Sequence, residues 1–193
     1  MGLTKTKVDS LKLQPGVSLL MQTYEKEPLP DKVVIIKQNV FPDDQGGWFK
    51  ENLRVDKDQN VLALKDAGID FRILQSNSSY IAPLGKRFWH IHPDKNHQPG
   101  QNEIWTTNGT LLLGLVDLRK SSTTCGKKVK VILSQDKAIY IPSGIAHGFI
   151  NPNNYPVTLT YFTDQHFLAS QDTQEHRIDP KNLPFDFVEP ELM

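Results

Sequence analysis

Two histidine segments contain the residues of this sequence that could do chemistry. The first has the pattern H-x-H, with His90 and His92, and the second has the pattern P-x-G-x-x-H, from Pro142 to His147. Side chains two positions apart on a β-strand point to the same face, so His90 and His92 would lie together. With His147 they could bind Zn or Fe, or one of them could act as a general base near neutral pH.

A carboxylate ligand in phase with these histidines is missing from the pattern. In barrels that bind a metal through two such segments, a glutamate precedes a glycine with six residues between them. Counting back from Gly109 gives Asn102, and Glu103 comes one residue late. Because a one-residue offset turns a strand side chain to the opposite face, we expect Glu103 to point away from the histidines. Histidines that only support a binding barrel are a further possibility.

The elements that must position the histidines are expected to be short β-strands. From residue 71 to 167, apolar segments of four to eight residues alternate with Gly, Pro, Asn and Asp, which is typical of an all-β sandwich or barrel. One short helix is expected over 55–68, ended by Gly68. The expected strands are Val33–Ile36, Trp48–Leu53, Phe71–Leu74, Phe88–Ile91, Glu103–Thr106, Leu111–Leu118, Lys128–Leu133, Ala138–Ile141 and Val157–Phe162.

Together with the histidine segments, this pattern predicts an all-β jelly-roll barrel of the cupin type with short peripheral helices. The 193 residues are expected to form a single domain, with an N-terminal arm over 1–32, a barrel core over 33–167 and a tail over 168–193. Lysine and arginine number 22, as do aspartate and glutamate, so no net charge attracts nucleic acid or an anionic membrane. The N-terminus has no long apolar run, which favours a cytoplasmic protein.

Four segments resemble the dTDP-4-dehydrorhamnose 3,5-epimerase family over residues 41–180. The segments D-L-R-x-x-S and I-P-x-G-x-A-H-G-F are specific in combination; the four are Gly47–Glu51, Gln75–Ser79, Val116–Ser122 and Ile141–Phe149. The resemblance implies a jelly-roll cupin, commonly a homodimer, that needs no cofactor. Its substrate would be a nucleotide-linked 4-keto-6-deoxyhexose of rhamnose biosynthesis for cell-surface polysaccharide.

The resemblance also implies a role for each matching residue. His90 falls on the catalytic base and Tyr161 on the catalytic acid, which exchange protons beside a ketone that acidifies the C–H bonds at C3 and C5. Asn102 falls on a lysine that would stabilise the enolate oxygen. The residues expected to bind the nucleotide or the sugar are Arg87, Glu51, Gln75, Asn77, His147 and Phe167.

Several positions depart from the family pattern. Asn102 replaces the lysine, Gly46 a phosphate-binding arginine and Ser78 a histidine, and no clear equivalent of the C-terminal aspartate that orients the base follows the pair at 179–180. Conversely, His92 replaces a glutamine and completes the H-x-H pattern. Epimerisation, or a related proton transfer on a keto sugar, is the expected function. The alternatives are a metal-dependent enzyme that uses the three histidines and a sugar-nucleotide-binding barrel without catalysis.

Overall fold

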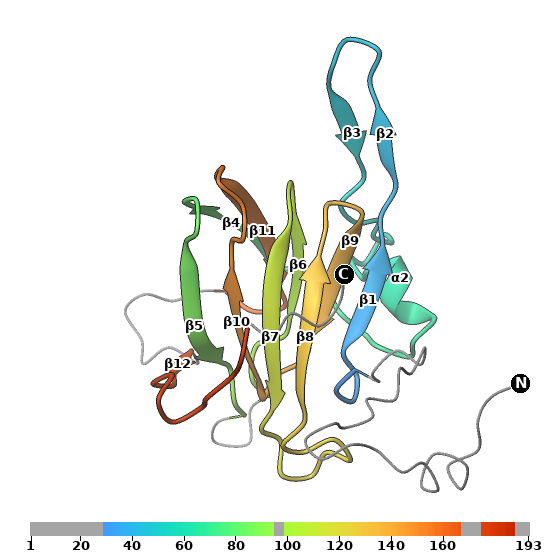
Figure 1. The fold of residues 1–193 in the computed structure, drawn as a ribbon. Helices are drawn as coiled ribbons and strands as arrows, with labels where there is room; N and C mark the ends of the chain where they lie inside the picture. The colour runs from blue at the N-terminus through green and yellow to red at the C-terminus, as the bar shows by residue number, and fades with distance from the viewer. Residues whose placement is uncertain (1–28, 95–98, 167–174, 188–193) are drawn as a thin grey trace, which may run out of the picture.

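Two antiparallel five-stranded sheets face each other in the computed structural model, which describes residues 29–94, 99–166 and 175–187 (Figure 1). The strand order is β1-β9-β6-β11-β4 in the first sheet and β12-β5-β10-β7-β8 in the second, and β2 and β3 form a separate hairpin. The elements are β1 (Val34–Lys37), β2 (Val40–Pro42), β3 (Trp48–Lys50), α2 (Leu62–Lys65), β4 (Gln75–Ile81), β5 (Lys86–Ile91), β6 (Glu103–Thr107), β7 (Leu111–Asp117), β8 (Lys128–Leu133), β9 (Lys137–Ile141), β10 (Ile145–Ile150), β11 (Val157–Thr163) and β12 (His176–Arg177).

The core between the sheets follows from alternation along the strands. Leu111, Leu113 and Leu115 of β7 are fully buried and pack against Ile139 of β9 and Leu159 of β11. Burying a leucine or isoleucine side chain completely contributes about 1.5–3 kcal/mol, so these inward-facing residues are a main source of the barrel's stability. The all-β prediction is confirmed.

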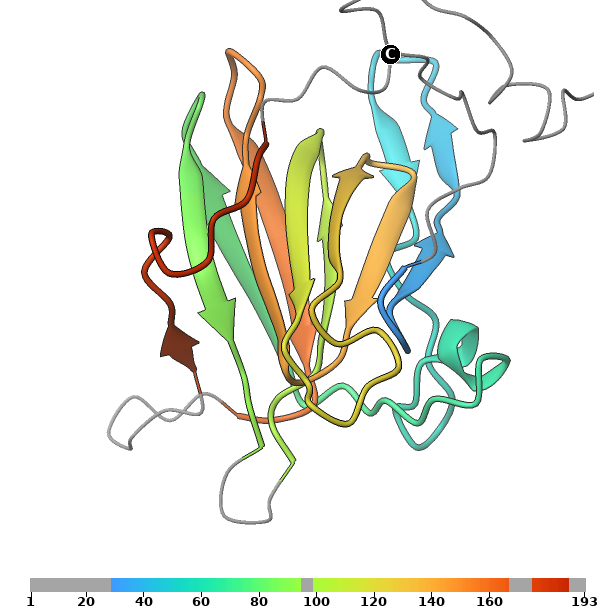
Figure 2. The same cartoon turned by 60° about the horizontal axis from the view of Figure 1, so that its bottom comes forward.

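Part of the outer face of each sheet is covered as well. On the first sheet, Phe71 and Leu64 of the α2 region pack against Ile104 and Tyr140. On the second, the C-terminal segment crosses β5, and its Phe185 contacts the indole of Trp89 at 5.3 Å between ring centroids. Figure 2 shows this segment in red, running along the outside of the barrel. The interior therefore does not have to supply all of the apolar burial and has room for polar side chains.

A β-bulge in β5 determines which of its side chains reach the interior. His147 of β10 pairs with His90, but Phe149, two residues later, pairs with Arg87, three residues earlier. The extra residue in β5 brings Arg87 to the same face as His90, although their spacing of three would place them on opposite faces of a regular strand. Both residues of the predicted site therefore lie on the face of β5 that is turned toward the first sheet.

Gly148 makes room for this bulge, so we expect Gly148→Ala to destabilise the protein by about 1–3 kcal/mol. A Cβ atom at this position would lie 2.6 Å from Cδ1 of Phe88 and 2.8 Å from the carbonyl oxygen of Arg87. Urea denaturation would measure the loss. Gly47→Ala is the matched control, because its Cβ would meet only Asp43, at 3.5 Å, and should change stability by no more than about 0.5 kcal/mol. Equal stability of the two variants would contradict this explanation of the bulge.

The helix expected over 55–68 is much shorter in the structure, where only Leu62–Lys65 are helical. The Asp56 carboxylate accepts hydrogen bonds from the backbone N–H groups of Asp58 and Asn60, which forms a turn where the helix was predicted. Gly68 has a φ of +68° and does end this segment. The strand expected over 71–74 is instead β4, which begins at Gln75. The described residues form no helix with the length and apolarity needed to cross a membrane.

Candidate functional site

One wall of the barrel interior carries two rows of polar and aromatic side chains, which belong to the first sheet. Directly paired residues of antiparallel strands point to the same face, so each row is a set of neighbouring side chains. The first row is Gln75, Thr163 and Glu103, and the second is Asn77, Tyr161 and Trp105.

The histidines come from the opposite wall, and His90 and His92 share a face, as the H-x-H spacing predicts. His147 of β10 pairs with His90 of β5, and their ring centroids are 6.2 Å apart. The His92 ring stacks on that of His147 at 5.5 Å. His92 and His147 are buried, so the two histidine segments do meet inside the barrel.

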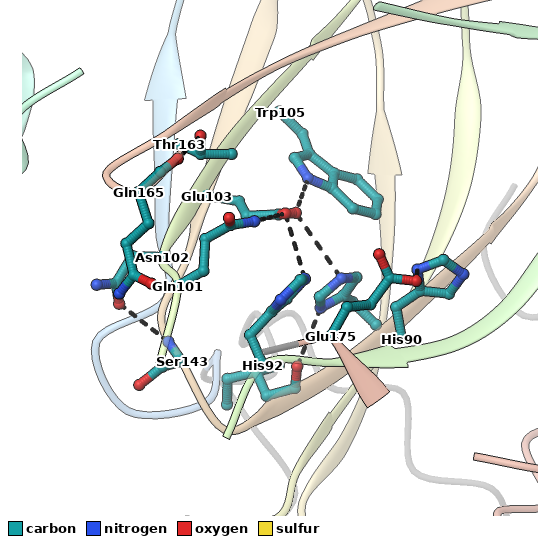
Figure 3. A network of polar contacts seen from close by, with 12 residues as sticks. His90, His92, Gln101, Asn102, Glu103, Trp105, Ser143, Thr163, Gln165 and Glu175 are labelled. Carbon is teal, nitrogen blue, oxygen red and sulfur yellow. Dashed lines mark hydrogen bonds and ion pairs between the residues drawn. The ribbon is translucent and has the colours of Figure 1, made fainter. Parts of the chain in front are cut away.

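Glu103 points toward these histidines, and the prediction that it points away is wrong. Its carboxylate lies 3.3 Å from Nε2 of His92 and accepts hydrogen bonds from the Trp105 indole N–H, at 2.5 Å, and from the Gln101 amide, at 2.6 Å (Figure 3). The count back from Gly109 crossed the β6–β7 turn, whereas the pairing of β6 with β9 and β11 determines which way Glu103 faces. Burial by itself would raise the pKa of the Glu103 carboxyl. The contact with His92, the histidine charges and the Trp105 hydrogen bond outweigh this effect and lower the pKa, so the carboxyl is ionised near neutral pH.

The His147 ring is held in one orientation by the backbone. Its Nδ1 lies 3.0 Å from the carbonyl oxygen of Ile145, where it can only donate a hydrogen bond. Burial lowers the pKa of His147 to about 4, although the Glu103 charge opposes this, so the ring is neutral near pH 7. Its Nε2 then carries a lone pair, which faces a carboxylate oxygen of Glu103 at 3.8 Å.

His90 has a carboxylate partner that the sequence comparison missed. Its Nδ1 lies 3.0 Å from Oε1 of Glu175, which immediately precedes β12, and β12 pairs with β5 so that Arg177 lies opposite His90. The hydrogen bond from His90 is the largest cause that lowers the pKa of Glu175 to about 2, so this carboxylate is ionised. Nε2 of His90 is buried and has no hydrogen-bond partner among the residues that the structure describes. This leaves Nε2 available to accept a proton.

Tyr161 and Arg87 are the remaining polar residues of the predicted site near the histidines. Burial is the largest cause that raises the pKa of the Tyr161 hydroxyl, and the negative charge of Glu103 adds to it, so the hydroxyl keeps its proton near neutral pH. Arg87 is exposed and lies over the Phe149 ring, with its guanidinium carbon 5.8 Å from the ring centroid. A proton acceptor, a proton donor and a cation are therefore available on facing walls of one barrel.

The comparison with known families agrees with this geometry. The dTDP-4-dehydrorhamnose 3,5-epimerase model matches residues 27–191. The chain belongs to this family. It is 30% identical over 122 residues to the dTDP-4-dehydrorhamnose 3,5-epimerases of Methanothermobacter thermautotrophicus and of Escherichia coli. Each match covers 62% of this chain, and the chain spans about three fifths of the length of these curated relatives, 60% and 62% respectively.

A solved structure supports the fold assignment. The Legionella pneumophila dTDP-6-deoxy-D-glucose-3,5-epimerase, in complex with dTDP-4-keto-L-rhamnose, has a TM-score of 0.61 and 26% sequence identity, over 77% of this chain and 73% of that chain. The likeness confirms the cupin-type jelly roll that was predicted from the sequence.

At the epimerase-family lysine position, Asn102 does not face the histidines. Its Oδ1 accepts hydrogen bonds from the Ser143 backbone N–H, at 2.9 Å, and from the Tyr140 hydroxyl, at 3.2 Å, and its Nδ2 donates to Asp164 at 2.6 Å. In Figure 3 this amide lies beside Ser143, apart from the histidine cluster. Because the amide is used to join β6 to the 142–144 turn, the expected role of Asn102 as an enolate stabiliser does not fit the structure.

The other epimerase-family positions fall into three groups. Gln75 and Asn77 lie in the interior rows, and the Gln75 amide donates to Oδ1 of Asn77 at 2.7 Å. Glu51 lies just after β3, where its carboxylate binds the Arg54 guanidinium through two oxygens, and no contact links it to a histidine in the part of the chain that the structure describes. Phe167 lies outside the described residues.

Proposed function

We propose that this chain catalyses proton transfer beside the ketone of a nucleotide-linked 4-keto-6-deoxyhexose, with inversion at C3, at C5 or at both. The observation that carries the proposal is the His90–Glu175 pair, 3.0 Å apart, with the second ring nitrogen of His90 buried and unpartnered within the described residues. A histidine whose Nδ1–H is bound by a carboxylate presents Nε2 as a base, which is the arrangement used for proton abstraction in many enzymes.

The chemistry divides between the two walls of the barrel. Nε2 of His90 takes the proton from the carbon next to the ketone, and the electrons of the broken C–H bond form the enolate. Tyr161, on the facing sheet, then returns a proton to the carbon from its hydroxyl, whose raised pKa keeps it protonated. Delivery from the opposite face inverts the stereocentre. The transfer involves no change of oxidation state and needs no redox cofactor.

Substrate binding is proposed for the residues that lie near this interior. Arg87 would contact the diphosphate, since its guanidinium is exposed on the face of β5 that carries His90. Gln75 and Asn77 offer amide groups to the sugar or the nucleotide from the first sheet. A nucleotide-sugar is therefore the proposed ligand, rather than nucleic acid or a membrane.

We also propose a cytoplasmic homodimer. The β2–β3 hairpin projects from the barrel in Figure 1 and exposes three aromatic side chains, Phe41, Trp48 and Phe49. Phe49 is 62% exposed, and aromatic surface of this kind is typical of protein interfaces. Sedimentation equilibrium of the full chain would test the dimer.

The reaction is tested by incubating the protein with dTDP-4-keto-6-deoxyglucose in D₂O and following the sugar by NMR. We expect deuterium to enter C3 or C5, and we expect no enzymatic exchange with His90→Gln. Nucleotide binding by both proteins is measured separately with dTDP. Binding without exchange in the unsubstituted protein would contradict the proposal and would support a sugar-nucleotide-binding barrel without catalysis.

A further inference from the structure

A second group of buried side chains lies beside the proposed base and takes no part in the proton transfer. The group comprises His92, Glu103 and His147, which are 6%, 4% and 3% exposed. Each can offer one ligand atom, and these three atoms all lie within 4.8 Å of one another. Figure 3 shows the His92 imidazole pointing at the Glu103 carboxylate from below, while the Trp105 indole approaches it from above.

The distances within the group fit a metal centre. Nε2 of His92 lies 3.3 Å from one carboxylate oxygen of Glu103, and Nε2 of His147 lies 3.8 Å from the other. Ligands that sit about 2.0–2.2 Å from a common ion, as nitrogen and oxygen ligands of zinc do, are separated from each other by roughly 3–4 Å. The three side chains thus need little movement to share one ion.

The hydrogen bonds around the group also favour a cation between the side chains. Nδ1 of His147 lies 3.0 Å from the Ile145 carbonyl oxygen, which can only accept a hydrogen bond, so Nε2 is the ring nitrogen left to bind an ion. This Nε2 faces a carboxylate oxygen of Glu103 across 3.8 Å, a separation that two ligands of one ion can have.

Outer contacts orient the carboxylate as they do in metal sites. The Trp105 indole donates to one oxygen of Glu103 and the Gln101 amide donates to the other. Such partners fix the orientation of a ligand and raise the affinity of the site for its metal. Since Glu103 and Trp105 are both buried, this orientation is built into the barrel rather than formed by chance at the surface.

We propose that His92, Glu103 and His147 form a binding site for a divalent transition-metal ion. Two imidazoles and one carboxylate, with open positions for water or substrate, suit Zn²⁺ or Fe²⁺. This set differs from the three histidines of the H-x-H and P-x-G-x-x-H segments, because Glu103 takes part and His90 is instead bound to Glu175. An ion held by these three residues would polarise a carbonyl oxygen of the substrate, a role that the Asn102 amide cannot take because it faces away from the histidines. This catalytic role rests on the proposed function, whereas metal binding itself does not.

The test is a titration of the full chain with Co²⁺ after treatment with a chelator and dialysis. We expect visible ligand-field absorption that saturates at one ion per chain and is removed by excess Zn²⁺. Glu103→Gln and His147→Gln should each weaken Co²⁺ binding by at least about 100-fold. Trp105→Phe keeps all three ligands, and loss of its hydrogen bond should weaken binding about 10–100-fold. His176→Gln removes an exposed histidine and should bind Co²⁺ like the unsubstituted protein.

Two results would overturn the site: no saturable absorption from the unsubstituted protein, which would leave a proton between Glu103 and the histidines, or equal Co²⁺ affinity in all variants. Circular dichroism would show which variants fold. If the two ligand variants do not, the unsubstituted protein and Trp105→Phe still decide the question. Co²⁺ binding is read without substrate, so this result is independent of the deuterium-exchange assay that tests the proposed function.

Discussion

Glu175→Gln should slow deuterium exchange into the keto sugar by about 10²–10⁴-fold while leaving the affinity for dTDP nearly unchanged. The Glu175 carboxylate accepts the Nδ1–H of His90 at 3.0 Å and thereby presents Nε2 as the base. A glutamine can hold the ring only weakly, can favour the wrong tautomer, and cannot stabilise the imidazolium that forms when His90 takes the proton. In other enzymes, loss of such an orienting carboxylate, or of the base itself, has effects of this size.

The measurement should separate kcat from KM, because Glu175 acts through His90 and not on the nucleotide. A fall in kcat with little change in KM is the expected signature of a positioning residue. His176→Gln, at the next residue along the chain, is the control; its side chain is exposed, and it should keep the exchange rate of the unsubstituted protein. A Glu175→Gln variant that folds and exchanges at the normal rate would remove Glu175 from the mechanism.

The importance of Glu175 could not have been found from motif spacing. It follows residues 167–174, which lie outside the described part of the chain, and reaches His90 only because β12 pairs with β5. Pairing between strands more than eighty residues apart is a tertiary event that leaves no local pattern. One signal was present in the sequence: Glu175 is an acidic residue four positions before Asp179. It lies before the aspartate-proline pair, whereas the family places its aspartate after that pair.

The alternation of side chains along a strand predicted correctly which face a residue points to within one strand, but the prediction failed when the count passed through a turn. The H-x-H rule correctly placed His90 and His92 on one face, because both lie on a continuous extended segment. The same rule was wrong for Glu103, since the count began at Gly109 and passed through the β6–β7 turn before it reached the strand. The Phe88–Trp89 bulge is the opposite case, because this irregularity brings Arg87 to the same face as His90, where simple alternation would not place it.

The apolar pattern predicted most barrel strands, because most of them carry several buried apolar side chains, such as Leu111, Leu113 and Ile139. It overestimated the helix over 55–68, where Val61 and Leu64 are buried against the first sheet and only one turn is helical. Apolar residues at helical spacing report burial on one side, and the Asp56 turn decides how the backbone achieves it. Burial was thus predictable, while the hydrogen-bonding pattern that produced it was not.

Asp117→Ala should lower the free energy of unfolding by about 3–5 kcal/mol, the usual cost of removing one partner of a buried ion pair. Asp117 ends β7 and is completely buried. Its carboxylate accepts hydrogen bonds from the Arg119 guanidinium at 2.9 and 2.8 Å and from the hydroxyls of Ser122 and Thr124, both at 2.6 Å. These contacts explain the D-L-R-x-x-S segment, because they fix the conformation of the loop between β7 and β8.

The same loop supports the turn that leads to His147. The Arg119 side chain packs so closely on Gly144 that a Cβ there would lie 2.5 Å from its Cγ, and Gly144 has a φ of +77°. The Gly144 N–H in turn donates to the carbonyl oxygen of His92 at 3.0 Å. Loss of Asp117 should therefore loosen the connection between the two histidine segments as well as the loop itself.

The effect of Asp117 should also depend on pH, in a direction that follows from its hydrogen bonds. Burial would raise the pKa of this carboxyl, but the bonds from Arg119, Ser122 and Thr124 hold it below its ordinary value of 3.8. Because the folded pKa is the lower one, the stabilisation is fully present above about pH 4, the ordinary aspartate pKa, and is lost as the pH falls further. Urea denaturation at pH 7 and pH 3 should show a smaller difference between Asp117→Ala and the unsubstituted protein at the lower pH.

Asp58→Ala is the control, because Asp58 is an exposed aspartate, and it should change stability by no more than about 0.5 kcal/mol at either pH. A loss for Asp117→Ala that is as small as that of the control would mean that the loop is held by its backbone alone, and that the D-L-R-x-x-S segment needs another explanation.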